Sequence, residues 1–66
     1  MSAIKVIEVI GISTESWEDA AASAVTEASK TVRNITGVDV ISQTAKVKDG
    51  SITEFHAACK LAFRVG

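Results

Sequence analysis

The stretch KTVRNITGVDV, at residues 30–40, marks the change from a helical pattern to a strand pattern. Before it, alanines and other apolar residues recur every three or four positions, and after it β-branched residues dominate. Gly37 lies at the junction, where a glycine with positive φ commonly ends a helix or makes a turn. We therefore expect a helix to end over residues 34–37 and a strand to begin at Val38.

Upstream of this junction the sequence predicts one long helix over residues 14–35. Ser13 is the expected N-cap, three acidic residues follow it at positions that favour negative charge, and Lys30 and Arg33 lie near the other end. The stripe that would face the core consists of Trp17, Ala20, Ala21, Ala24, Ala28, Val32 and Ile35. Trp17 is expected to anchor this helix on a sheet, and the alanines would allow a close approach.

Three strands are predicted around the helix, over residues 3–12, 38–47 and 52–65. Gly11 indicates a bend or a close backbone approach near the end of the first strand. The segment KDGS, at residues 48–51, contains the Asp-Gly pair typical of a tight antiparallel hairpin. The predicted order is β-α-β-β, an α+β fold in a single domain over residues 1–66.

The composition limits how such a short chain can be stabilised. It has 66 residues, 47% of them hydrophobic, with one cysteine, one histidine and a formal net charge of −1. Chains of fewer than roughly 70 residues usually need disulfides, a metal or association, and a single cysteine and a single histidine leave association. The single thiol suits a reducing compartment, and we expect a cytoplasmic protein. Mixed charges and the lack of a long apolar run argue against binding to nucleic acid or a membrane.

Strand alternation indicates that one helix cannot cover the sheet. The odd-numbered residues from Phe55 to Val65 share the face expected to meet the helix, and the even-numbered ones share the other. The helix would be about 33 Å long against about 45 Å for the third strand. The first strand has apolar residues on both faces. We predict a symmetric homo-oligomer; the alternative is a monomer with an exposed apolar sheet.

The segments ESWEDAAASAV, KTVRNITGVDV and DGSITEFHAACKLAFRVG, in this β-α-β-β order, resemble the dodecin family over nearly the whole chain. The resemblance implies a homododecamer in which a three-stranded antiparallel sheet wraps around one long helix in each subunit. It also implies a non-enzymatic protein that binds flavin, as FMN or riboflavin, at subunit interfaces and sequesters it.

The resemblance places the flavin site at residues that depart from the family pattern. The family's flavin-stacking tryptophan falls on Gly37 and its flavin-contacting glutamine falls on His56. Arg64 matches an arginine that contacts a nucleotide phosphate in some bacterial members, whereas a second such arginine corresponds to Thr44. The implied ligand-binding residues are Gly37, Val38, Gln43, His56 and Arg64. The alternative is an oligomeric shell that has lost flavin binding and holds ions or another phosphate-bearing ligand.

The remaining polar residues allow simpler interpretations. His56 could contact a ligand or pair with a carboxylate such as Glu54 of a neighbour. Cys59 lies on the opposite strand face from His56, so no Cys-His nucleophile forms and Cys59 is expected to be a small core residue. Three acidic residues could meet at a symmetry axis to bind a cation, or form solvated surface: Asp39, Asp49 and Glu54. An enzyme is not expected, because no catalytic constellation is present.

Overall fold

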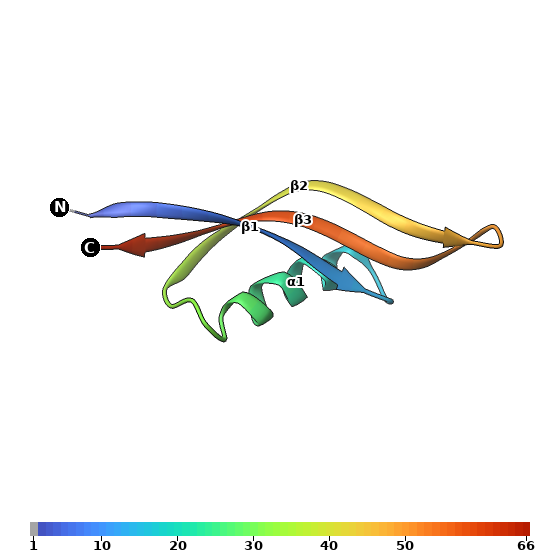
Figure 1. The fold of residues 1–66 in the computed structure, drawn as a ribbon, viewed down its shortest axis with the longest axis horizontal. Coiled ribbons are helices and arrows are strands. Elements are labelled where there is room, and N and C mark those ends of the chain that lie inside the picture. Colours follow the sequence, from blue (N-terminus) through green and yellow to red (C-terminus); the bar gives the residue numbers. More distant parts are fainter. Residues whose placement is uncertain (1) are drawn as a thin grey trace.

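The computed structural model describes residues 2–66 and has the order β1 (Ala3–Ser13), α1 (Trp17–Ala28), β2 (Ile35–Lys48) and β3 (Ser51–Val65). The three strands form one antiparallel sheet in the order β1-β3-β2, so β3 is central. Helix α1 lies against one face of this sheet (Figure 1). The predicted α+β architecture with a β-α-β-β order is confirmed.

Helix α1 is shorter than predicted at both ends. Ser16, not Ser13, is the N-cap, and its side chain accepts a hydrogen bond of 3.0 Å from the backbone N–H of Asp19. Ser13 instead closes β1, accepting from the backbone N–H groups of Glu15 and Ser16 and donating to Asp19 at 2.7 Å. Two serines three residues apart offer the same capping chemistry, so the sequence alone did not distinguish them.

The C-terminal part of the predicted helix is a turn and the start of β2. Helix α1 ends at Ala28 with Ser29 as its C-cap, and Asn34 has a φ of 63°. Ile35 is already the first residue of β2, so the helical spacing of Val32 and Ile35 was misleading. Residues 31–36 include four β-branched residues, and this residue type favours an extended backbone over a helix.

The sequence suggested that Gly37 ends the helix, but in the structure it does not. It lies inside β2, opposite Ala62 and next to an irregularity in the strand register, and its φ is not positive. The left-handed conformation at the junction is adopted by Asn34 instead, a residue type that tolerates it well. A side chain at position 37 would meet no backbone strain.

The core lies where α1 crosses β1 and β3. Its fully buried residues are Ala20, Ala24, Ala57, Cys59 and Leu61. The odd-numbered face of β3 meets the helix as predicted. Gly11 permits the close approach, because a Cβ there would lie 1.8 Å from the carbonyl oxygen of Ala20.

The β2–β3 hairpin reaches well beyond the helix (Figure 1). Asp49 and Gly50 have φ values of 51° and 79°, and positive φ at both central residues is the type I′ arrangement that matches the twist of the strands. The subunit is consequently long and thin, with extents of 53 × 20 × 13 Å.

Much of the sheet lacks a partner within the subunit. At 12 residues, α1 is about 18 Å long, whereas the 15 residues of β3 span about 50 Å. Ten large apolar side chains among the described residues are 39–66% exposed: Ile4, Val6, Ile10, Ile12, Val38, Val40, Ile41, Val47, Ile52 and Val65. Within the part of the chain that is described, no helix is long and apolar enough to cross a membrane.

Candidate functional site

The strand register divides the five sequence-predicted site residues between the two faces of the sheet. Gly37 is opposite Ala62 and shares the helix-free face with His56 and Arg64. Val38 is opposite Leu61, and Gln43 is opposite Ala57, so both belong to the helix side. The five residues do not converge within one subunit.

Gly37 borders two shallow hollows, one on each side of β2. The hollow on the helix-free face has a volume of about 320 Å³ and is lined by Val6, Gly37, Val38, Asp39, Lys60 and Ala62. The other, of about 220 Å³, is bordered by Val25, Ile35 and residues 36–38. Neither lining includes an aromatic ring. A planar ligand placed here meets small and aliphatic side chains and no stacking partner from the same subunit.

The side chain of His56 contacts a residue of its own strand, β3. Its Nε2 lies 2.6 Å from Oε1 of Glu54, and the two side chains are 23% and 31% exposed. The predicted pairing with Glu54 of a neighbour is therefore replaced by a pair within one subunit. Ile12 and Thr44 flank His56 on β1 and β2 in the strand register. This contact occupies Nε2, one of the two ring nitrogens that could contact a ligand.

Arg64 is exposed near the end of β3, opposite Ile4. Thr44, the second position of the phosphate contact implied by the family resemblance, is opposite His56. His56 and Arg64 are eight residues apart on β3, a separation of about 26 Å. A phosphate held by Arg64 would therefore need its other contacts from a different subunit.

A row of charged residues crosses the helix-free face, and the sequence reasoning missed it. Lys60 on β3 is opposite Glu8 of β1 on one side and Asp39 of β2 on the other. Alternation along β3 could show that Lys60 lies on this face, but its two neighbours follow only from the strand register. The row separates the Gly37 hollow from a second hollow of about 450 Å³ lined by Glu8, Val9, Ile10, Ile41, Ala58 and Cys59.

The acidic residues considered for a symmetric cation site lie apart in the subunit. Asp39 belongs to the Lys60 row, Asp49 to the hairpin turn, and Glu54 contacts His56. Among the described residues, no three of His, Cys, Asp or Glu are grouped closely enough to hold a metal ion. A cation site built from several subunits stays a prediction.

Cys59 and Trp17 are structural, as predicted. Cys59 is buried, and its Sγ donates to the carbonyl oxygen of Ala57 at 3.5 Å. Burial raises the pKa of the Cys59 thiol, and the negative charge of Asp39 raises it further. Trp17 packs edge-on against Phe55, with ring centroids 4.8 Å apart, and its Nε1–H donates to the carbonyl oxygen of Thr44 at 2.8 Å. Trp17 thus ties the start of α1 to both β3 and β2.

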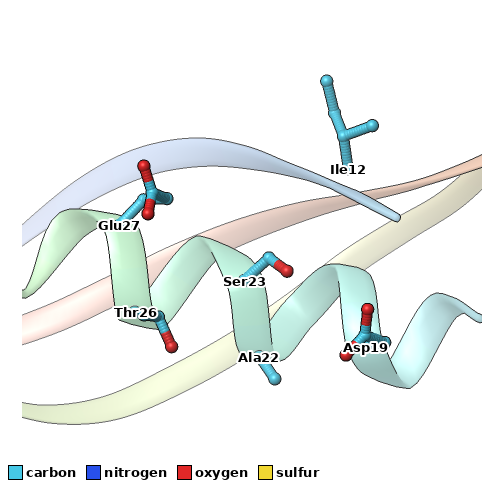
Figure 2. A pocket seen from close by; sticks show the side chains of 6 residues that line it. All are labelled: Ile12, Asp19, Ala22, Ser23, Thr26 and Glu27. Atoms are coloured by element: carbon cyan, nitrogen blue, oxygen red, sulfur yellow. The ribbon is translucent and has the colours of Figure 1, made fainter. Parts of the chain in front are cut away.

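A further groove runs between α1 and the end of β1 (Figure 2). It has a volume of about 380 Å³ and is lined by Ile12, Asp19, Ala22, Ser23, Thr26 and Glu27. Its lining combines Ile12 of β1, whose side chain projects away from α1 in Figure 2, with two carboxylates from the helix, of which Glu27 forms an ion pair of 2.6 Å with Lys30. We call this surface the α1–β1 groove.

Comparison with known proteins agrees with this architecture. The family model described as Dodecin matches residues 3–66. The chain belongs to the dodecin family. This dodecin is 37% identical, over 65 residues, to calcium dodecin from Mycobacterium tuberculosis, covering 98% of this chain and 92% of that protein.

Solved dodecin structures share the fold closely. A dodecin from Streptomyces coelicolor superimposes with a TM-score of 0.95 at 31% identity, covering 98% of this chain and 93% of the other. The calcium-chelating dodecin of M. tuberculosis, whose crystal structure contains a novel calcium-binding site, gives a TM-score of 0.83 at 37% identity, with 97% and 91% covered.

Proposed function

We propose that this dodecin is a non-enzymatic binding protein of the cytoplasm, which assembles as a homododecamer and holds small ligands between its subunits. The observation that carries this proposal is the large apolar surface that α1 leaves uncovered on the sheet. Burial of apolar surface is the main driving force for association, and identical copies offer a self-complementary cover. The separation of Cys59 and His56 on opposite faces of β3 argues against a catalytic pair.

The favoured ligand is a cation or a phosphate-bearing anion that charged side chains hold at subunit contacts. Two features of the helix-free face support this choice over tight flavin binding. Gly37 supplies no aromatic platform, and the imidazole of His56 is already engaged by Glu54. The 37% identity to a protein described as calcium dodecin supports the cation. Carboxylates contributed by several chains can provide the oxygen ligands that Ca²⁺ prefers.

Flavin, as FMN or riboflavin, is the second candidate, and one observation favours it. The hollow beside Gly37 is open, because a Cβ at this position would have only the Cβ of Ala62 within 4 Å, at 3.8 Å. A flavin ring could therefore enter, with Arg64 of some subunit near its phosphate. Without an aromatic platform the affinity should be lower, by roughly 0.5–1.5 kcal/mol for the missing stacking alone.

Native mass spectrometry followed by ligand titration tests these assignments. We expect an assembly of twelve subunits, a calorimetric response to Ca²⁺ or to inorganic phosphate, and little quenching of riboflavin or FMN fluorescence at micromolar protein. A monomer at micromolar concentration would overturn the assembly. Strong flavin quenching by the assembly would make flavin the ligand.

A matched pair of variants at position 37 separates a missing platform from a different pocket. Because the backbone at Gly37 is compatible with any side chain, Gly37→Trp should restore stacking and tighten flavin binding about two- to tenfold. Gly37→Leu adds volume without a ring and should give no such gain. If the assembled Gly37→Trp protein binds flavin no better than wild type, the pocket itself does not accept the ring.

A further inference from the structure

The three aspartates of this chain differ in the residue that follows each of them. Asp19 is followed by an alanine, Asp39 by a valine and Asp49 by a glycine. The side-chain carbon of an aspartate can be attacked by the backbone nitrogen of the next residue, and a side chain on that residue hinders the approach. Asp49 is therefore the aspartate whose neighbouring nitrogen is least hindered.

Asp49 and Gly50 form the exposed end of the β2–β3 hairpin, which projects beyond α1 (Figure 1). A Cβ built at Gly50 would have no atom within 4 Å, so the space around this residue is open. The two ion pairs among residues 2–66 do not involve Asp49. No neighbouring element obstructs a movement of the Asp49 carboxyl group toward the backbone of Gly50.

The backbone nitrogen of Gly50 lies outside the hydrogen-bond ladder of the hairpin. The last pair in the β2–β3 register is Lys48 with Ser51, so the N–H of Gly50 belongs to the turn. Among residues 2–66, the backbone hydrogen bonds of turns and loops do not include this N–H. The group that would attack the carboxyl carbon is therefore not engaged elsewhere.

The other two aspartates lack this freedom. The carboxylate of Asp19 accepts the hydroxyl of Ser13 at 2.7 Å, and the N–H that follows Asp19 donates to the carbonyl oxygen of Ser16 at 3.0 Å. Asp39 is paired with Lys60 in the sheet, and the valine after it is paired with β3 as well. These two sites provide internal controls within the same chain.

The backbone at Asp49 is also in a conformation that is easily left. Its φ of 51° is left-handed, a region that aspartate tolerates but that costs free energy for any residue with a side chain. Ring closure requires rotation of the main chain and the side chain at Asp49. The tip of a projecting hairpin can open in this way while the core under α1 stays folded.

We propose that Asp49 is a site of spontaneous isomerisation to isoaspartate, through a succinimide ring closed by the backbone nitrogen of Gly50. In the first step a bond forms between this nitrogen and Cγ of Asp49, and the hydroxyl of the protonated carboxyl group leaves with the amide proton as water. In the second step water adds to one of the two ring carbonyls. Addition at Cγ restores aspartate, and addition at the main-chain carbonyl leaves the chain linked through the side chain, as isoaspartate.

Isoaspartate would loosen the hairpin tip without unfolding the subunit. It adds one methylene group to the main chain of a two-residue turn whose geometry matches the strand twist. The nearest contacts that depend on this geometry are the Val47–Ile52 pair and the bond of 3.4 Å from the Thr53 hydroxyl to the carbonyl oxygen of Lys46. The buried core lies under α1 and is not part of the tip.

Ageing of the folded protein at 37 °C and neutral pH tests the proposal. Cleavage after glutamate gives one peptide, residues 28–54, that contains both Asp39 and Asp49, and electron-transfer fragmentation locates isoaspartate within it. Isoaspartate should accumulate at Asp49 at least about tenfold faster than at Asp39 or Asp19, because a turn opens more readily than a paired strand or a helix. Equal rates at Asp49 and Asp39, or isoaspartate at Asp49 only in urea-unfolded protein, would overturn the proposal.

Two variants keep the turn type and change the reaction, since Asn-Gly and Gly-Gly also favour a type I′ turn. Asp49→Asn should react several-fold faster than wild type, because a neutral amide is attacked more readily than a carboxylate anion. Asp49→Gly removes the reacting group, so hydrogen exchange at Val47 and Ile52 should quicken with age in wild type and stay constant in this variant. An Asp49→Asn protein that does not deamidate would show that the turn forbids ring closure. The reaction needs no ligand and no partner, so its outcome is separate from that of the proposed function.

Discussion

Two glycines in this chain have opposite structural roles, although the sequence presents both simply as interruptions of strand patterns. Gly11 is buried where β1 meets α1, and the space of its missing side chain is filled by the backbone of Ala20. Gly37 is exposed, and the space of its missing side chain is open. The close approach at Gly11 was predicted from its place in a strand. The conformation of Gly37 was not, because it depends on where α1 ends.

Replacement of Gly11 by alanine should destabilise the protein by about 3 kcal/mol, the upper part of the range for overpacking. The added Cβ would lie 1.8 Å from a backbone oxygen, which can move only if α1 shifts away from the sheet. Gly37→Ala is the matched control and should change stability by less than about 1 kcal/mol. Urea unfolding monitored by Trp17 fluorescence measures both. A loss below about 1 kcal/mol for Gly11→Ala would contradict the close packing.

Cys59 should make stability depend on alkaline pH. Burial, followed by the charge of Asp39, raises the pKa of its thiol above the ordinary value of 9.0. The folded state therefore holds the proton more tightly than the unfolded state, so the stabilising contribution is complete below about pH 9 and is lost as pH rises through the folded pKa. Urea unfolding between pH 7 and pH 10.5 should show this decline, and Cys59→Ala should show a smaller one. Equal slopes in the two proteins would rule out the thiol as the cause.

At the scale of elements, the sequence predicts the number and order of strands and helices better than their ends. The hairpin was predicted closely, because Asp49 and Gly50 carry the chemistry that its turn demands. The predicted helix is too long at its C-terminal end. Val32 and Ile35 recur at a helical spacing, although Val32 lies in the loop after α1 and Ile35 is the first residue of β2. The ends of α1 depend on which serine reaches a backbone N–H and on packing against the sheet.

Ser16→Ala should destabilise the protein by about 1 kcal/mol, the usual cost of losing an N-cap. The side chain of Ser16 accepts the backbone N–H of Asp19, which lies in the first turn of α1 and would be left unpaired. Ser29→Ala, at the exposed other end of the helix, is the control and should be nearly neutral. Chemical denaturation gives both values. If Ser16→Ala leaves the free energy of unfolding unchanged while Ser13→Ala lowers it, Ser13 rather than Ser16 is the N-cap.

At the scale of the whole molecule, the uncovered apolar sheet was predictable but the arrangement of the candidate site was not. Alternation along β3 already shows which residues share the helix-free face. The neighbours of Lys60, and the separation of Arg64 from Thr44, depend on how three strands align, which no local pattern specifies. Alignment within one subunit also brings together only part of the candidate site, so in the proposed assembly the remaining ligand contacts would come from other subunits.

Assembly should make thermal stability depend on protein concentration. A subunit of 66 residues with one 12-residue helix buries few large side chains by itself, and most of its remaining apolar surface can be hidden only by other copies. Unfolding is then coupled to dissociation, and each tenfold dilution lowers the free energy of unfolding by about 1.3 kcal/mol per subunit. The apparent Tm should fall by roughly a few degrees per tenfold dilution, measured by circular dichroism from about 100 μM to 1 μM.

Ile10→Lys tests the same point by mutation. The side chain of Ile10 lies on the helix-free face and is 63% exposed in the subunit. The variant should lower the Tm strongly if other copies cover this face, and only slightly if water does. A Tm that is constant across the dilution series, together with a tolerated Ile10→Lys, would show that the subunit is stable alone.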